Sequence, residues 1–210
     1  MRLYDYAASG NCFKVRLLLG MLGVEYERVP IDIFGGDTLT CEYGMINPLR
    51  ETPVLELDGG ERLGQSNAIL WYLGEGTEFL PQGRLERGQV AQWLSFEQER
   101  VMGGLGGPRF RLLTGRATPE ELEPRLATGR GALEVLDAHL AARDWLLGDA
   151  PSIADLGVFP YVSVSPVEIP DHVDAWLDRV RALPGFVDDF VTYPENARPG
   201  VARSIYDSMN

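Results

Sequence analysis

Ser9 lies at the turn between a strand-like segment and an apolar helix, where a hydroxyl group can do chemistry. The stretch YAASGNCFKVRLLLGMLG, residues 6–23, also places Asn11 and Cys12 in this turn. A hydroxyl at a helix N-terminus can donate a hydrogen bond to a thiolate, and the helix dipole favours the same anion. Lowering a thiol pKa from about 8.5 by two units requires roughly 2.7 kcal/mol, which one such bond and the dipole can supply. The alternative is a helix cap, in which Ser or Asn only satisfies a backbone N–H group.

The dipeptide Thr52–Pro53 stands at the start of a predicted strand in the segment RETPVL. Proline removes a hydrogen-bond donor from the sheet at this position. If the bond is cis, the backbone N–H and C=O groups of Thr52 turn outward, and an extended peptide can bind there as an added strand. The alternative from the dipeptide alone is a trans proline at the edge of the sheet.

The segment GQSNAIL places Gln65 beside Ser66, a residue type that caps helices well. A helix N-terminus binds anions, and the Gln65 amide offers both a donor and an acceptor. Together the two residues can hold the carboxylate and the ammonium group of an α-amino acid. The alternative is a cap without a ligand, worth about 1 kcal/mol.

The elements that position these residues alternate between strand and helix in the first part of the chain. Alternating apolar residues and an Asp-Gly-Gly turn predict strands, and apolar residues at i, i+3, i+4 and i+7 predict helices. In chain order we expect a strand at 2–6, a helix closed by Gly23, a strand at 25–32, a short helix or irregular loop at 38–45, a hairpin at 52–63 and a helix at 66–75.

After a glycine-containing stretch typical of a linker, every clear pattern is helical. The candidate helices are 85–102, 119–143, 153–164, 173–183 and 186–192. The segment GGLGGPRF, residues 103–110, is expected to break the first of them. Ser152 and Asp155 form a capping-box pattern before a segment that is apolar nearly all round, which predicts a buried helix and no chemistry.

The composition excludes several classes of function. With 210 residues, of which 45% are apolar, the chain can bury a sizeable core. The formal net charge of -12 disfavours nucleic acid and anionic membranes as partners, because both require basic patches. Cys12 and Cys41, the two cysteines, fit neither a metal-ligand nor a CxxC redox spacing, so no metal is expected. We see no signal-peptide pattern and no apolar run of about 18 residues, and we expect a cytoplasmic protein.

These features occur together and in an order that resembles the cytosolic glutathione S-transferase family, bacterial type. The resemblance covers essentially the whole chain and is carried by SGNCFKVRLLL, NPLRETPVLELDGG, QSNAILWYL, SIADLGVFPY and VDAWLDRVRALPGFVD. It implies an α/β thioredoxin-like N-terminal domain that binds glutathione and an all-α C-terminal domain. We expect the first domain at 1–76, a linker at 77–85 and the helical domain at 86–210.

The resemblance also implies a role for each candidate residue. Ser9 would stabilise the glutathione thiolate, with Asn11 as a second, lower-ranked candidate, and Cys12 would be structural. Thr52, followed by a cis Pro53, would pair through its backbone with the cysteinyl part of glutathione. Gln65 and Ser66 would hold the γ-glutamyl end. A small hydrophobic electrophile would bind between the domains, beside the helix around 93–102 and the segment 103–110, and the protein would be a homodimer that serves detoxification.

Two departures from the family pattern concern charge. Relatives often carry a basic residue near Leu39 for the glycine carboxylate of glutathione, whereas GDTLTCEY has none. Glu51 adds an anion beside the site, and Arg50 or another arginine would have to compensate. Two other functions therefore stay open: a glutathione-dependent isomerase, dehalogenase or peroxidase, and a non-catalytic binding or regulatory protein with the same fold.

Overall fold

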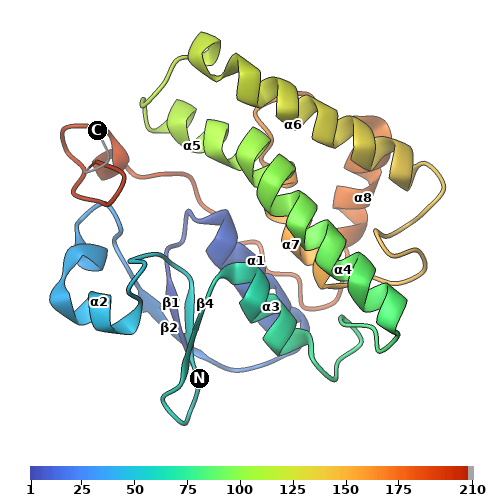
Figure 1. The fold of residues 1–210 in the computed structure, drawn as a ribbon, viewed down its shortest axis with the longest axis horizontal. Helices are drawn as coiled ribbons and strands as arrows, with labels where there is room; N and C mark the ends of the chain where they lie inside the picture. The colour runs from blue at the N-terminus through green and yellow to red at the C-terminus, as the bar shows by residue number, and fades with distance from the viewer. Residues whose placement is uncertain (208–210) are drawn as a thin grey trace.

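A four-stranded mixed sheet forms the base of the N-terminal half (Figure 1). The structure is a computed structural model and describes residues 1–207. The strands are β1 (Arg2–Asp5), β2 (Glu27–Pro30), β3 (Val54–Glu56) and β4 (Arg62–Gly64). Their order is β2-β1-β3-β4, with β1 parallel to β2 and antiparallel to β3, and β3 antiparallel to β4. The strands β1 and β2 lie within the predicted strands and β3 within the predicted hairpin, while β4 extends one residue beyond that hairpin, to Gly64.

The helices of this half lie against the sheet and supply the turns of interest. They are α1 (Gly10–Met21), the short η1 (Asp37–Leu39), α2 (Cys41–Ile46) and α3 (Ser66–Gly74). Helix α1 is buried from Cys12 to Leu19, because it packs against α3 on one side and α7 on the other. Gly23 follows α1 with φ 62°, the left-handed conformation that commonly ends a helix.

The C-terminal half is helical, in agreement with the sequence patterns (Figure 1). Its elements are α4 (Arg84–Phe96), the π-helical stretch η2 (Glu97–Gly106), α5 (Gly107–Leu113), α6 (Pro119–Leu140), α7 (Ile153–Ser163), α8 (Asp171–Arg181) and the short η3 (Glu195–Ala197). Helix α3 ends at Gly74 and α4 begins at Arg84, so residues 75–83 connect the two halves.

Helix α7 is the centre of the helical half, as its apolar sequence predicts. Ser152 and Asp155 form the expected capping box, and residues Ile153 to Val162 are buried. The Asp155 carboxylate also accepts hydrogen bonds from the Leu146 backbone N–H at 2.9 Å and from the Trp176 indole at 3.0 Å. Burial nevertheless raises the pKa of Asp155, and these bonds offset part of that effect.

The expectation that GGLGGPRF breaks the helix was wrong. Gly103 to Phe110 lie inside a helical run that continues from α4 through η2 into α5. The glycines are explained by close packing, because a Cβ on Gly104 would lie 2.5 Å from the Gly129 backbone nitrogen of α6. A Cβ on Gly106 would lie 2.6 Å from the Tyr161 ring of α7. The glycines bring helices together rather than ending one.

The helix expected at 186–192 is also absent, and the segment has no regular secondary structure. Apolar residues at 186, 187, 190 and 191 imitate a helical period. Their rings instead pack separately: Phe190 stacks on Phe13 at 4.9 Å between centroids, and Phe186 lies 5.7 Å from Phe159. Between them Asp189 accepts from the buried Arg16 Nε at 2.8 Å, which fastens this segment to α1.

The remaining residues, up to 207, run back over the N-terminal half and end near α2 and α5 (Figure 1). Arg203 N–H donates to the Phe34 carbonyl at 2.8 Å, and Asn196 Nδ2 donates to Asp32 at 2.8 Å. Among the helices of the described residues, none has the length and apolarity needed to cross a membrane. Within residues 1–207 no group of three or more His, Cys, Asp or Glu side chains is arranged to hold a metal ion.

Candidate active site

A cavity of about 340 Å³ lies between the two halves of the chain. One wall contains every residue that the sequence singled out for chemistry or binding: Ser9, Asn11, Arg50, Thr52, Pro53, Gln65 and Ser66. The opposite wall comes from η2, α5, α7 and the C-terminal segment, together with Tyr6 after β1 and Phe34 after β2. The fold therefore gathers these seven residues from three separate turns around one space.

Ser9 lies at the N-terminus of α1 and faces this cavity. Its Oγ accepts a hydrogen bond from the Cys12 backbone N–H at 3.3 Å, so the predicted helix cap is present. The cap uses a lone pair and leaves the hydroxyl hydrogen as a donor. Capping and anion binding are therefore compatible roles for Ser9.

Asn11 is held by a buried polar network below the cavity. Its Oδ1 accepts from Lys14 Nζ at 2.9 Å and from Ser66 Oγ at 3.2 Å. Lys14 Nζ also lies 2.8 Å from Glu97 Oε2, and both charged side chains are fully buried. Because both bonds occupy Oδ1, the Asn11 amide nitrogen is the group left to donate to a ligand.

The Thr52–Pro53 peptide bond is cis, as the resemblance implies. Pro53 is buried and Thr52 is partly exposed at the cavity. The loop before them is fixed by two hydrogen bonds to the Glu51 carbonyl, from Tyr43 Oη and from Asn47 Nδ2, each at 2.9 Å. The backbone of Thr52 is therefore presented by a loop that its neighbours hold in place.

Ser66 is not the N-cap that its type suggested. Gln65 occupies the cap position with φ 66° and makes no capping hydrogen bond, whereas Ser66 is the first residue of α3. The Ser66 hydroxyl instead bonds to Asn11, so it links the turns before α1 and α3. A positive φ is uncommon for a residue with a side chain, and such strain occurs often at ligand-binding positions.

Glu51 and Arg50, the two charged residues that depart from or compensate the family pattern, both lie near Gln65 at the cavity. Glu51 is exposed at the cavity, and Gln65 Nε2 donates to its carboxylate at 3.2 Å. Arg50 Nη1 donates to the carbonyls of Thr38 and Thr40, at 2.7 and 2.8 Å. Part of the Arg50 guanidinium therefore supports the loop around η1, and Leu39 is exposed beside it.

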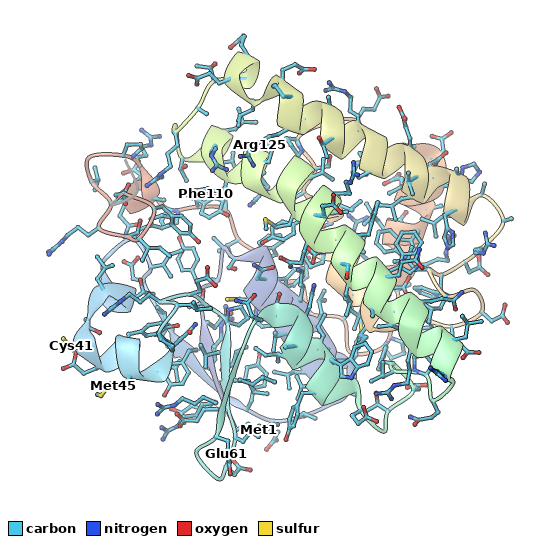
Figure 2. The ribbon with its side chains drawn as sticks, viewed as in Figure 1. Met1, Cys41, Met45, Glu61, Phe110 and Arg125 are labelled. Atoms are coloured by element: carbon cyan, nitrogen blue, oxygen red, sulfur yellow. The ribbon has the colours of Figure 1, made fainter. Side chains whose placement is uncertain are left out.

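The second wall of the cavity is aromatic, which the sequence patterns did not reveal. Its rings are Tyr6, Phe34, Phe110, Tyr161, Tyr193 and Tyr206. Phe110, labelled in Figure 2, lies 5.2 Å from the Tyr206 ring and 5.4 Å from the Tyr193 ring, between centroids. Met102 and Phe110 come from the segments expected to line the electrophile pocket, whereas Tyr193 and Tyr206 come from the C-terminal segment after α8.

Cys12 lies just beneath Ser9 but is fully buried. Its Sγ accepts from the Tyr6 backbone N–H at 3.3 Å, and burial raises the pKa of the thiol to about 12. Cys41, by contrast, is exposed on α2 (Figure 2). Since the thiolate is the nucleophile, the two thiols should differ sharply in reactivity.

Dithiobis(nitrobenzoate) at about pH 8 should therefore react with one thiol of the folded protein, because Cys41 is exposed to the reagent, whereas Cys12 is buried and the pKa of its thiol is raised. The absorbance of the released nitrothiobenzoate should correspond to Cys41 alone, and to both cysteines after unfolding in guanidinium. In Cys41→Ser the fast release should vanish. Rapid release of two equivalents from the folded wild type would show that Cys12 is accessible.

Comparison with known proteins places this site in a family. The family model of the glutathione S-transferase N-terminal domain matches residues 8–75, and that of the C-terminal domain matches residues 119–195. The chain is 30% identical to glutathione S-transferase F9 of Arabidopsis thaliana over 81% of this chain and 87% of that protein. It is 34% identical to maleylacetoacetate isomerase of Rhizobium meliloti (strain 1021), over 76% and 79% of the two chains.

A solved structure agrees with these matches. The glutathione S-transferase of Pseudomonas fluorescens Pf-5 superposes with a TM-score of 0.85 at 36% identity, covering 90% of this chain and 98% of that chain. The chain therefore belongs to the glutathione S-transferase family of enzymes. Its fold is the architecture of that family, a thioredoxin-like domain followed by a helical domain.

Proposed function

We propose that this enzyme conjugates the glutathione thiolate to a small electrophile. One observation carries the proposal: Ser9, the Thr52–Pro53 bond and the Gln65–Ser66 turn line one wall of a cavity whose other wall is aromatic. The polar wall suits a charged tripeptide, and the aromatic wall suits an apolar co-substrate. This arrangement supports a bacterial-type transferase with serine at the activating position.

We propose the following roles for the residues of the polar wall. The Ser9 hydroxyl would donate to the sulfur and hold it as a thiolate, while the Thr52 backbone pairs with the cysteinyl unit as an added strand does. Gln65 and Ser66, at the N-terminus of α3, would bind the γ-glutamyl carboxylate. Arg50 would add positive charge through the part of its guanidinium that does not hold the loop. No step in this scheme requires a metal.

A glutathione-dependent isomerase is the second candidate, because a relative with 34% identity carries the name maleylacetoacetate isomerase. Dehalogenase or peroxidase chemistry would use the same thiolate, and a binding or regulatory role would use the cavity without turnover. Conjugation, isomerisation and peroxidation differ in what happens to glutathione: conjugation consumes it into a stable adduct, isomerisation returns it and peroxidation oxidises it.

An assay with glutathione and chlorodinitrobenzene tests the proposal. The enzyme should produce the thioether, detected by its absorbance, faster than buffer does, with saturation in both substrates. Consumption of free thiol should equal the product formed. If glutathione binds but neither this nor other aryl and alkyl halides react, a binding protein or an isomerase becomes the better account.

We further propose that the chain divides into a glutathione-binding domain at 1–76, a linker at 77–85 and a helical domain at 86–210.

We also propose that the protein is a homodimer, located in the cytoplasm, with a role in detoxification. Exposed apolar side chains support the dimer: Met45 on α2, Leu49 after it, Tyr72 on α3 and Leu85 on α4. A shallow hollow between α3 and α4 is also lined in part by apolar side chains, Trp71 and Leu94. Light scattering should give twice the mass of one chain, and a monomer mass would contradict the dimer.

A further inference from the structure

We infer that the electrophile of this enzyme carries an anionic group, such as a carboxylate, beside a flat apolar body, and that Arg111 recognises that group. The inference rests on the proposed function, because it concerns the second substrate of the same cavity. It starts from Arg111, a cation on the aromatic wall that forms no ion pair with a carboxylate of the described residues.

Arg111 lies on α5 and lines the cavity, where it is half-buried. Its Nη1 makes a weak hydrogen bond of 3.5 Å to the Gly107 carbonyl of its own helix. Within residues 1–207 no carboxylate forms an ion pair with Arg111, whereas Arg116 Nη2 lies 2.7 Å from Asp207. A guanidinium at a cavity without a carboxylate partner is a ready binding group for an anion.

Two further arginines lie against the rings of this wall. Arg109 is 8% exposed, and its Cζ lies 5.2 Å from the centroid of Tyr193. Arg116 Cζ lies 5.4 Å from the centroid of Phe34 and 5.2 Å from that of Phe110. Arg109 forms no ion pair within residues 1–207 and raises the electrostatic potential on the aromatic side, although the chain as a whole carries a net charge of -12. The charge of Arg116 is offset by Asp207.

The one carboxylate among the lining residues, Glu51, belongs to the polar wall, where Gln65 Nε2 bonds to it. Asp207 is already paired with Arg116 and with the Ser204 hydroxyl at 2.5 Å. The positive charge on α5 therefore faces the space between the rings without an acidic neighbour that pairs with it in the described part of the chain. A planar anion could stack between rings while its carboxylate meets Arg111.

A chlorodinitrobenzoate with its carboxyl group para to the chlorine is a suitable probe, and its methyl ester is a neutral copy. In both, the thiolate sulfur attacks the ring carbon that bears chlorine. A C–S bond forms, the C–Cl bond breaks, chloride leaves with the electron pair, and the thiol proton passes to solvent. The two probes differ in charge at a position that takes no part in bond breaking.

The experiment compares kcat/KM for acid and ester, each relative to its uncatalysed rate, in wild type, Arg111→Gln and the control Arg125→Gln on α6. Wild type should favour the acid. Arg111→Gln should lower the acid's kcat/KM about tenfold and leave the ester's within about twofold, as loss of one charged hydrogen-bond pair predicts. Arg125, which is exposed and outside the cavity lining, should change neither. The KM for glutathione should stay unchanged in both variants.

Equal losses for acid and ester in Arg111→Gln would overturn the inference, since Arg111 would then only shape the cavity. A raised KM for glutathione with an unchanged acid-to-ester ratio would also overturn it and assign Arg111 to the glycine carboxylate. If neither probe reacts with wild type, the proposed conjugation fails, and calorimetry with unreactive dinitrobenzoate decides the anion site separately. Binding tighter than that of its methyl ester, and lost in Arg111→Gln, supports the inference; equal binding of the two contradicts it.

Discussion

Ser9→Ala is expected to reduce kcat for conjugation about 10²-fold, the size of effect that follows removal of one donor to a developing anion. The pKa of the bound glutathione thiol should rise toward its ordinary value near 8.5, because the thiolate loses its hydroxyl partner. The ultraviolet absorbance of the thiolate, followed across pH with the complex, measures this shift directly.

The same substitution removes the N-cap of α1, so stability needs its own control. Thr118 caps α6 through a capping box and lies outside the cavity lining. Thr118→Ala should cost a similar 1 kcal/mol or so of unfolding free energy and leave both kcat and the thiol pKa unchanged. An unaltered rate and thiol pKa in Ser9→Ala would exclude Ser9 as the activating group, and a larger effect of Asn11→Ala would transfer the role to Asn11.

Lys14→Met is expected to lower the free energy of unfolding by about 3–5 kcal/mol, the usual result of leaving one buried charge unpaired. Lys14, the only lysine of the chain, and Glu97 are fully buried and 2.8 Å apart. Without the ammonium group, Glu97 Oε2 keeps the amides of Asn67 at 3.0 Å and Gln98 at 2.8 Å, and Oε1 has no partner among the described residues. Urea denaturation measures the loss.

The double variant Lys14→Met/Glu97→Gln should recover much of the stability, because no charge then remains buried. Arg130→Met is a matched control: its ion pair with Glu123 is exposed on α6, and its loss should cost about 0–1 kcal/mol. If the double variant is as unstable as the sum of its single variants, the two residues do not interact in the way the structure indicates.

Lys14→Met should also weaken glutathione binding, since Lys14 Nζ donates to Asn11 Oδ1 and so fixes the Asn11 side chain at the cavity.

The sequence indicated the fold well where a local pattern and a tertiary role coincide. The apolar period of α1, the capping box of Ser152 and Asp155, and the hairpin after Pro53 are all present, because each is determined by near neighbours in the chain. The cis bond at Pro53 was not decided by its dipeptide. It followed from the family resemblance, which carries information about the surrounding fold.

The errors occurred where distant packing decides the conformation. Glycines such as Gly104 resemble helix breakers, and only contact with Gly129 explains them as helix-packing residues. The rings of Phe186 and Phe190 imitate a helical period, yet each fills a different part of the core. Tyr193, Tyr206 and Arg111 escaped notice for the same reason, since nothing in their local sequence shows that they line a cavity with Ser9.

The central claim is that the cavity between the domains binds glutathione, despite Glu51 and the absence of a basic residue near Leu39. Calorimetric titration of the wild-type protein with reduced glutathione tests this claim most directly. The account predicts saturable, sub-millimolar binding of one glutathione per chain, weakened in a Ser66→Ala variant that still folds. An absence of binding heat with millimolar glutathione, or binding that Ser66→Ala leaves unchanged, would contradict it.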